Sequence, residues 1–193
     1  MKIILGSASA NRKKVLARMG YSFTIMVADI DEKQIHSEDV RTLPLLIARA
    51  KSEALLSRIK EPSILITADQ VTLWKEELRE KPQDAKEARR YLKTISGTPS
   101  YSLNGITVTN TATGVRHEAM DESFLVFRSI PDDAIEKVIA SGEAFKWAGA
   151  YSPSHPLLTP YIERMEGAEG SILGLPIKLT ETLIQKALFG IPR

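Results

Sequence analysis

The sequence predicts an α/β protein whose core is a largely mixed, twisted sheet with flanking helices. Short continuous apolar runs, which suit buried strands, alternate with segments whose apolar residues recur at helical spacing. Two longer β-type runs follow, separated by a turn sequence, and they favour an antiparallel hairpin within the sheet. The chain has 193 residues, 43% of them hydrophobic and 26% charged. It is therefore long enough for one compact domain, or for two small lobes that share a core around a cleft.

The first half of the chain is expected to alternate strands with helices. Residues 3–5 form a short apolar run that ends in a turn. From Asn11 the apolar residues lie at helical spacing, with Ser9 or Asn11 as the N-cap and Gly20 as the stop. The elements that follow are a strand over 21–27, an acidic loop over 29–32, a helix over 43–59 and a strand over 63–68. The last strand would deliver Asp69 at its carboxyl end, where open α/β sheets bind their ligands.

The second half is expected to supply a hairpin, two long strands and further helices. The expected elements are a hairpin over 71–78, a helix from Asp84 to Ser96-Gly97, strands over 101–109 and 115–130, a helix from Pro131 to Ser141-Gly142, a short helix through Glu163 and a closing helix over 175–188. No internal repeat interrupts this order, so the elements are expected to share one architecture.

Composition excludes several classes of function. The chain carries 26 Lys and Arg against 24 Asp and Glu, so a generally basic surface for nucleic acid is not expected. The absence of cysteine excludes disulfides and thiolate chemistry and favours an intracellular protein. No stretch approaches a signal-type apolar region or the ~20 apolar residues of a membrane span. We therefore expect a cytoplasmic protein with no membrane partner.

A phosphate site is suggested by the segment over residues 6–14. It places backbone amides, two hydroxyls and three cations at the start of a helix, where free N–H groups and the helix dipole favour an anion. The segment matches neither the Walker loop nor the dinucleotide fingerprint. An ordinary capped helix with a solvated basic face explains the same residues, and this alternative stays open at the level of the segment alone.

Carboxylates and lysines further along the chain are candidates for metal and phosphate chemistry. Asp69 could hold a divalent cation or accept a proton from an attacking water, although a turn cap or an ion pair would also explain it. Glu32 lies in an acidic loop that could supply oxygen ligands to a hard cation, or could simply be solvated. Lys81 stands before a proline that stiffens its backbone, and Lys51 lies on the inner part of a helix. The three histidines show no metal-ligand spacing, so a zinc site is not expected.

The order and spacing of these short motifs agree with one known family over almost the whole chain. The matching motifs are Ser7-Ala8-Ser9-Ala10-Asn11-Arg12, Asp31-Glu32, Lys51, Ala68-Asp69-Gln70-Val71, Lys81-Pro82, Ser96-Gly97, Ala148-Gly149-Ala150-Tyr151 and Gly170-Ser171-Ile172-Leu173-Gly174-Leu175-Pro176. Each motif is degenerate, but their joint order is specific. The sequence resembles the Maf family of nucleoside triphosphate pyrophosphatases, which implies a single Maf-like domain over residues 1–193.

The resemblance implies hydrolysis of a nucleoside triphosphate to the monophosphate and pyrophosphate, with Mg²⁺ or Mn²⁺ as cofactor. It also implies a mixed sheet in two lobes around a nucleotide cleft, a homodimer, and a house-cleaning role in nucleotide metabolism. The implied roles are Asp69 as proton acceptor, Glu32 and Asp69 as metal ligands, Arg12, Lys51 and Lys81 as cations that neutralise the triphosphate, and Ser7 and Ser9 as hydrogen-bond partners of its oxygens. Fixed cations and a metal suit an in-line displacement that needs no covalent nucleophile.

Base selection is expected at Asn11, Gln70 and Ser154, by position in the family pattern. The branch that prefers pyrimidines carries Arg, Thr and Gln at these places, and the branch that acts on 7-methyl-GTP carries Trp, Gln and Glu. Only Gln70 agrees with the second branch, so the three positions leave the base open. The expected substrate is a non-standard, modified or selected nucleoside triphosphate, with 7-methyl-GTP as one candidate. The first motif also departs from the family pattern, because Ala10 replaces a proline and the amide of Asn11 replaces a cation.

Two other functions stay open on the sequence. Because the first motif is altered, a non-catalytic regulator stays open as an alternative. Such a regulator would have the same fold and would bind nucleotide or nucleic acid. A general phosphatase, which would release orthophosphate, is a third hypothesis. Thermal stabilisation by nucleotide without turnover would separate the regulator from the enzyme, because a ligand of the folded state stabilises it by mass action.

Overall fold

Two compact units make up the chain in the computed structural model, which describes residues 1–190. The first unit holds residues 1–70, 103–121 and the chain from Ala168 onward, and the second holds Val71–Ser102 and Glu122–Gly167. Three long strands contribute residues to both units. These strands are β3 (Ser63–Trp74), β5 (Ser100–Asn110) and β6 (Arg116–Phe127).

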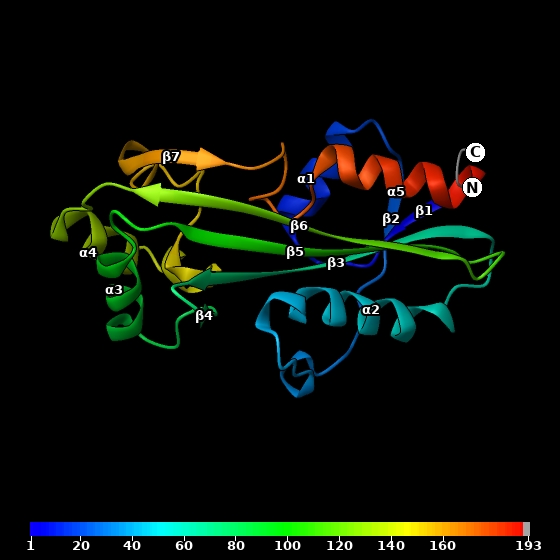
Figure 1. Ribbon diagram of the computed structural model, residues 1–193, viewed down its shortest axis with the longest axis horizontal. Coiled ribbons are helices and arrows are strands. Elements are labelled where there is room, and N and C mark those ends of the chain that lie inside the picture. The colour runs from blue at the N-terminus through cyan, green and yellow to red at the C-terminus, as the bar shows by residue number, and fades with distance from the viewer. Residues whose placement is uncertain (191–193) are drawn as a thin grey trace. The chain divides into compact units, whose positions relative to one another are not determined.

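All strands belong to one mixed sheet of seven strands, as the sequence predicts (Figure 1). The remaining strands are β1 (Lys2–Leu5), β2 (Phe23–Ile25), β4 (Glu77–Arg79) and β7 (Ile162–Glu166). Their order is β2-β1-β3-β5-β6-β7, with β4 paired to β3 outside this path. Strand β1 runs parallel to both β2 and β3, whereas β4 and β7 pair antiparallel with β3 and β6.

In the first unit, helices cover both faces of the sheet (Figure 1). The helices are α1 (Ala10–Arg18), α2 (Leu43–Leu56) and α5 (Ile177–Phe189). Ile3 and Leu5 of β1 lie in the same buried cluster as apolar residues of α1 and α5. Ile4 instead packs with Leu55 of α2. Because successive side chains of a strand point to opposite faces, this apolar run buries residues on both sides of the sheet.

Helix α1 begins and ends where its sequence predicts. The side chain of Ser9 accepts a hydrogen bond from the backbone N–H of Arg12, so Ser9 rather than Asn11 is the N-cap. Gly20 follows the helix with φ +83°. This left-handed conformation costs glycine little, and it turns the chain toward β2. The start of α1 therefore lies directly after the loop that carries Ser7 and Ser9.

The second unit contains α3 (Ala85–Thr94) and α4 (Asp132–Ala140). Its β3–β4 hairpin turns at Lys75 and Glu76, which have φ +47° and +63°. Positive φ at both turn residues suits the right-handed twist of the flanking strands. The described chain also has short 3-10 helices: η1 (Glu32–Gln34), η2 (Val40–Thr42), η3 (Glu143–Lys146), η4 (Ala148–Ala150) and η5 (Thr159–Tyr161).

The structure corrects two predicted elements. Strand β3 does not end before Asp69 but continues to Trp74, so Asp69 lies inside a strand. The continuation forms because Thr72 and its neighbours pair with β4. The short helix expected through Glu163 is also wrong, since η5 ends first and Glu163 lies in β7. Pairing with β6 provides the backbone partners that hold this segment extended.

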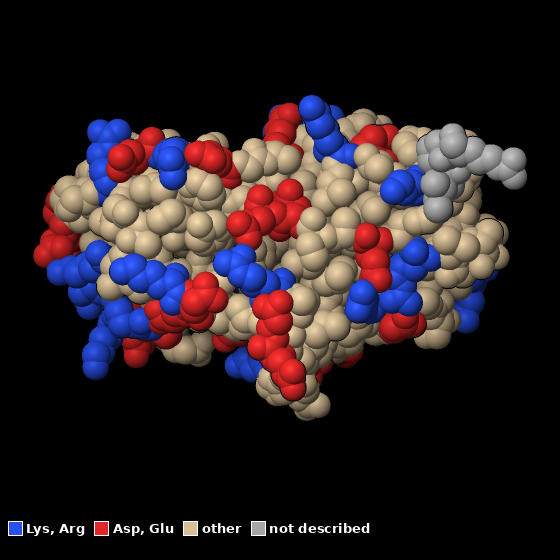
Figure 2. Space-filling view, in the orientation of Figure 1, with Lys and Arg blue, Asp and Glu red and all other residues tan. Residues whose placement is uncertain are grey.

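Charged side chains of both signs are intermixed over the face shown in Figure 2. Two of the surface pairs are bidentate, with both carboxylate oxygens used. Arg49 contacts Glu118 at 2.7 Å, and Arg89 contacts Glu136 at 2.6 and 2.7 Å. The positive and negative side chains, which are nearly balanced in the sequence, thus form local ion pairs on the surface. Within residues 1–190, no helix has the length and apolar character needed to cross a membrane.

Candidate active site

The loop between β1 and α1 presents two hydroxyls and one guanidinium in a connected set. The Oγ of Ser7 accepts hydrogen bonds from the backbone N–H of Ser9 and from Nη1 of Arg12, each at 3.2 Å. The Oγ of Ser9 accepts from the backbone N–H of Arg12 at 3.4 Å. Because both oxygens serve as acceptors here, each hydroxyl hydrogen is available to donate to an anion.

Arg12 is a buried cation with a fixed orientation. Its residue is only 8% exposed, and its Nε donates to the carbonyl oxygen of Gly174 at 3.0 Å. Burial lowers the pKa of the Arg12 guanidinium from its ordinary value, and the charges of Asp69 and Glu32 offset part of that effect. The guanidinium is still charged at neutral pH, since an arginine side chain keeps its proton in proteins. A buried fork of donors of this kind suits the planar recognition of phosphate oxygens.

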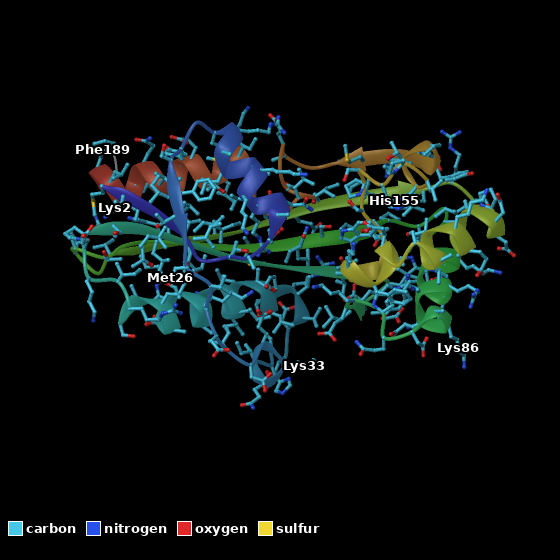
Figure 3. The ribbon with its side chains drawn as sticks, turned by 180° about the vertical axis from the view of Figure 1, so that it is seen from behind. Lys2, Met26, Lys33, Lys86, His155 and Phe189 are labelled. Atoms are coloured by element: carbon cyan, nitrogen blue, oxygen red, sulfur yellow. The ribbon has the colours of Figure 1, made fainter. Side chains whose placement is uncertain are left out.

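Lys51 lies between two carboxylates that come from different elements. Helix α2 carries Lys51, β3 carries Asp69, and η1, whose Lys33 is labelled in Figure 3, carries Glu32. The Nζ of Lys51 is 2.7 Å from Oδ1 of Asp69 and 2.9 Å from Oε1 of Glu32. The side chains of Lys51 and Asp69 are each 11% exposed, whereas that of Glu32 is 48% exposed. The group is therefore buried at Asp69 and open to solvent at Glu32.

The electrostatic surroundings of Asp69 suit a proton acceptor. Burial raises the pKa of the Asp69 carboxyl above its usual range, and the positive charges of Lys51 and Arg12 offset only part of this rise. The nearby charge of Glu32 raises the pKa further. A carboxylate with a raised pKa is a stronger base than an exposed aspartate, which favours removal of a proton from water.

Thr67 contributes to this group, although sequence reasoning did not single it out. Its Oγ1 donates to the carbonyl oxygen of Ala48 at 2.7 Å and lies 2.7 Å from Oγ1 of Thr107. The hydrogen bond to Ala48 joins β3 to α2, at a position two residues before Asp69 in the strand and about one turn before Lys51 in the helix. The available signal was a threonine inside an otherwise apolar buried run, because a buried hydroxyl must find a hydrogen-bond partner.

The loop over residues 170–174 is a second contribution that was missed. Its carbonyl oxygens accept hydrogen bonds from site residues: Gly174 accepts from Arg12, and Ile172 accepts from Nε2 of Gln70 at 3.1 Å. Asn104 holds the same loop by donating to the carbonyl of Ser171 at 2.9 Å. The sequence showed a glycine-rich motif here, but it could not show which side chains the backbone would meet.

The structure places the sequence-predicted residues in two groups. The first unit brings together Ser7, Ser9, Arg12, Glu32, Lys51, Asp69 and Gln70 through the contacts described above. Asn11 belongs to the same unit and is partly exposed in α1. Lys81 and Ser154 belong to the second unit, where both are exposed. The Oγ of Ser154 lies 3.0 Å from that of Ser152.

Asp69 and Glu32 are the two carboxylates of this group that could hold a divalent cation. Their carboxylates converge on the single position that the ammonium of Lys51 occupies, so they already approach one positive charge from two sides. Mg²⁺ is commonly held by one or two carboxylates, with substrate phosphates and waters completing its coordination. Among residues 1–190, no group of three or more His, Asp or Glu side chains is placed to hold a metal.

Comparison with known proteins places the chain in a family. The model of the Maf-like protein family matches residues 2–187. The chain therefore belongs to the Maf-like family, as its motifs predict. Among its relatives, a 7-methyl-GTP pyrophosphatase of Dictyostelium discoideum is 40% identical over 191 residues, covering 95% of this chain and 96% of the relative.

Two bacterial relatives are dTTP/UTP pyrophosphatases. That of Vibrio cholerae is 29% identical over 185 residues, covering 96% of this chain and 97% of the relative. That of Clostridium botulinum is 30% identical over 189 residues, covering 97% and 100%. These alignments span nearly the whole of each protein, so the similarity is not confined to one motif.

Proposed function

We propose that this protein is a nucleoside triphosphate pyrophosphatase that cleaves the bond between the α- and β-phosphates. The observation that carries the proposal is the buried carboxylate of Asp69, with its raised pKa, held beside Lys51 and Arg12. Family membership supports it, since the relatives compared above are named as pyrophosphatases of nucleoside triphosphates. The products would be a nucleoside monophosphate and pyrophosphate.

In the proposed mechanism, Asp69 accepts the proton of a water that attacks a phosphorus atom of the scissile anhydride. The new P–O bond forms from the water oxygen, and the bond from the attacked phosphorus to the bridging oxygen breaks. The leaving group is pyrophosphate when the α-phosphorus is attacked and the nucleoside monophosphate when the β-phosphorus is attacked. Arg12 and the hydroxyls of Ser7 and Ser9 bind the phosphate oxygens and stabilise the charge that develops on them. Lys51 adds a further positive charge and keeps Asp69 ionised and oriented.

A divalent cation, Mg²⁺ or Mn²⁺, is proposed as the cofactor. Asp69 and Glu32 would hold it, and it would neutralise charge on the triphosphate. The support for this assignment is the convergence of two carboxylates from β3 and η1 on one cation position. Chelation of the metal with EDTA should abolish turnover, and added Mg²⁺ or Mn²⁺ should restore it. Turnover that persists in EDTA would exclude this cofactor.

For the substrate, we propose a modified purine nucleotide of the 7-methyl-GTP type. Gln70 agrees with that branch of the family, and the Dictyostelium relative is named for that activity. Gln70 is partly exposed, and its amide nitrogen is held by the loop carbonyl of Ile172. This hydrogen bond would orient the Gln70 amide for contact with the base. Asn11 and Ser154 differ from the branch pattern, so their contribution to base selection is specific to this chain.

The test is a nucleotide panel with separate measurement of each product. Purified protein with Mg²⁺ or Mn²⁺ is incubated with 7-methyl-GTP, GTP, ATP, dTTP, UTP and CTP. We expect monophosphate and pyrophosphate in equal amounts, with the highest kcat/KM for 7-methyl-GTP. Release of orthophosphate would indicate a general phosphatase. Thermal stabilisation by a nucleotide without turnover would instead support a non-catalytic regulator that binds nucleotide. The altered residues Ala10 and Asn11 are the reason for this alternative.

We also propose a homodimer that acts in the cytoplasm. The support is the family resemblance and, for the compartment, the absence of cysteine from the chain. Size-exclusion chromatography with light scattering tests the assembly. We expect twice the mass of one chain, and the mass of a single chain would refute the dimer.

A further inference from the structure

The loop over residues 170–174 holds two candidate site residues of the first unit through its backbone carbonyls. The carbonyl oxygen of Gly174 accepts from Nε of Arg12 at 3.0 Å. That of Ile172 accepts from Nε2 of Gln70 at 3.1 Å. A Cβ at Gly174 would lie 3.2 Å from Nε of Arg12 and 3.2 Å from Oε1 of Gln70. The two side chains therefore meet at this loop, and the position of its backbone sets where both of them point.

The carbonyl oxygen of Ser171 connects the same loop to the sheet. It accepts from the backbone N–H of Gly174 at 2.9 Å and from Nδ2 of Asn104 at 2.9 Å. Nε2 of Gln70 lies 3.4 Å from this oxygen, farther than from the carbonyl oxygen of Ile172. A carbonyl oxygen has two lone pairs, and the two shorter hydrogen bonds already use them. Asn104 thus takes a place that the Gln70 amide could otherwise occupy, and Gln70 donates mainly to Ile172.

Asn104 is a fully buried residue of β5, and its hydrogen bonds fix the orientation of its amide. Besides the contact with Ser171, its Nδ2 donates to Oδ2 of Asp121 in the neighbouring strand β6 at 3.1 Å. Within the part of the chain that the structure describes, Oδ1 of Asn104 has no hydrogen-bond partner. Turning the amide over would point this oxygen at a carbonyl and a carboxylate. Because both of these are acceptors, the observed orientation is the stable one.

We propose that Asn104 is a positioning residue that sets the orientation of the Gln70 amide and thereby the preference for the base. This inference rests on the proposed function, in which Gln70 contacts the base. With Nε2 held by the loop, Oε1 of Gln70 is left to accept a hydrogen bond from the base. A guanine-type base has an N–H and an amino group side by side on its Watson–Crick edge, whereas uracil has one N–H between two carbonyls. A correctly placed acceptor therefore favours the guanine-type base.

A double-mutant cycle tests whether Asn104 acts through Gln70. Four proteins are compared: wild type, Asn104→Ala, Gln70→Ala and the double variant. Base selectivity is measured as kcat/KM for 7-methyl-GTP divided by kcat/KM for UTP. We expect Asn104→Ala to lower this ratio about 10-fold in the wild-type background and less than about 2-fold in the Gln70→Ala background. Equal losses in both backgrounds, or no loss in either, would overturn the inference.

Asn110 provides a matched control on the same strand. It is also buried, and its Nδ2 donates to the backbone carbonyl of Ala187 in α5 at 2.9 Å, the same distance as in the contact of Asn104 with Ser171. Asn110→Ala therefore removes the same chemical group, together with a hydrogen bond to α5 instead of the loop. We expect both variants to have a lower midpoint of thermal unfolding and only Asn104→Ala to lose selectivity. An equal loss of selectivity in the two variants would overturn the inference.

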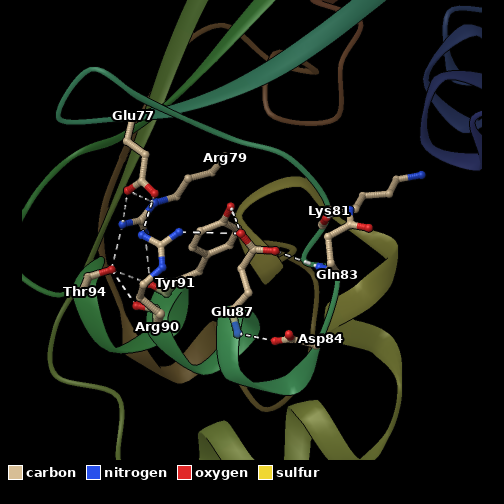
Figure 4. Close-up of polar contacts among 9 residues, drawn as sticks. All are labelled: Glu77, Arg79, Lys81, Gln83, Asp84, Glu87, Arg90, Tyr91 and Thr94. Carbon is tan, nitrogen blue, oxygen red and sulfur yellow. Dashed lines mark hydrogen bonds and ion pairs between the residues drawn. The ribbon is translucent and has the colours of Figure 1, made fainter. Parts of the chain in front are cut away.

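A second control lowers stability in the other unit. Thr94 of α3 accepts a hydrogen bond from Nη2 of the buried Arg79 at 2.8 Å (Figure 4). Thr94→Val removes this acceptor and retains the branched shape of the side chain. We expect a lower midpoint of thermal unfolding with unchanged base selectivity. A loss of selectivity as large as that of Asn104→Ala would mean that the ratio follows stability alone, and the inference would fail.

Asp121→Ala keeps the inference testable when Asn104→Ala does not fold. Asp121 is only partly buried, and its removal releases one amide hydrogen of Asn104 while Asn104 itself stays in place. We expect selectivity to fall about 3-fold, and this loss should disappear in the Gln70→Ala background. Unchanged selectivity of a folded Asp121→Ala protein would contradict the proposed role of the Asn104 amide.

The orientation of the Gln70 amide is also measured without substrate, by NMR on isotope-labelled protein. The side-chain amide resonances of Gln70 are identified by their loss in Gln70→Ala. We expect them to shift in Asn104→Ala and to keep their positions in Asn110→Ala. Absence of pyrophosphate release from the wild type would refute the proposed function. Unshifted Gln70 resonances in Asn104→Ala would instead refute the positioning role, whatever the activity of the protein.

Discussion

At the scale of single residues, the candidate site depends on buried charges that are held by several partners. Taking a carboxylate and an ammonium out of water costs more than a surface pair returns, so a pair such as Asp69 and Lys51 is weak evidence for stability. Burial raises the pKa of the Asp69 carboxyl, and groups with perturbed pKa values cluster at functional sites. Arg12 is likewise a buried charge, and its burial is compensated by directed hydrogen bonds to Ser7 and Gly174.

Gly174 offers a residue-scale prediction with a matched control. Gly174 and Gly20 have nearly the same backbone, with φ +85° and +83°. A Cβ on Gly174 would lie 3.2 Å from Nε of Arg12 and 3.2 Å from Oε1 of Gln70, whereas one on Gly20 would meet nothing within 4 Å. Each change to alanine should cost about 1 kcal/mol of unfolding free energy from the left-handed backbone alone.

Only Gly174→Ala should also impair catalysis, because its methyl group displaces Arg12. We expect a loss of kcat/KM of about 10-fold or more for Gly174→Ala and none for Gly20→Ala. Urea denaturation and steady-state kinetics on both variants provide the comparison. Equal activity of the two variants would show that the loop over residues 170–174 does not orient the cation.

At the scale of elements, the closing helix is tied to the start of the chain. The hydroxyl of Tyr21, just before β2, donates to both carboxylate oxygens of Glu181 in α5, at 2.8 and 2.9 Å. Burial and this hydrogen bond raise the pKa of Tyr21 to about 12 from 10.0. Helix α5 follows the loop over residues 170–174, so its docking helps to set where that loop begins and ends.

Tyr21→Phe is expected to lower the free energy of unfolding by about 1 kcal/mol at neutral pH, through loss of the hydrogen bond. Between pH 10 and about 12, the folded wild type retains a proton that the unfolded chain has released, so its stability falls as pH rises. The variant lacks this group, and the difference between the two proteins should shrink across that range.

Chemical denaturation at several pH values measures the effect of Tyr21→Phe. Tyr161→Phe is the control, because among residues 1–190 the hydroxyl of Tyr161 has no hydrogen-bond partner. A difference between wild type and Tyr21→Phe that stays constant from pH 7 to 12 would argue against the Tyr21–Glu181 contact.

Helices and strands differ in how well the sequence could predict them, because some depend on local signals and others on pairing with another strand. Helix α1 followed from the Ser9 cap and the Gly20 stop, both of which are local signals. Strand β3 was predicted too short, because Asp69 and Gln70 interrupt the apolar run while β4 supplies the pairing that extends it. Strand β7 was missed for a different reason, because its backbone partners lie in β6, which is distant in sequence. Pairing with a distant strand leaves little trace in the local pattern.

At the scale of the whole molecule, the mixed sheet and the family were predictable, and the contacts within the site were not. Motif order along the chain carries the family signal, and the match over residues 2–187 confirms it. By contrast, Arg12 meets a carbonyl 162 residues away, and Lys51 meets Asp69 across 18 residues. Residue types at these positions suggested their chemistry. Only the fold could show that a lysine lies between the two candidate metal ligands.

The central claim is that Asp69 is the base of a pyrophosphatase, and one measurement tests it most directly. Pyrophosphate release from the preferred triphosphate is compared between wild type and Asp69→Asn, with Mg²⁺ or Mn²⁺ present. We expect the variant to lose about 10³-fold in kcat, the scale of a missing general base, and to retain its fold by thermal melting. Activity of Asp69→Asn within a few-fold of wild type would contradict the account.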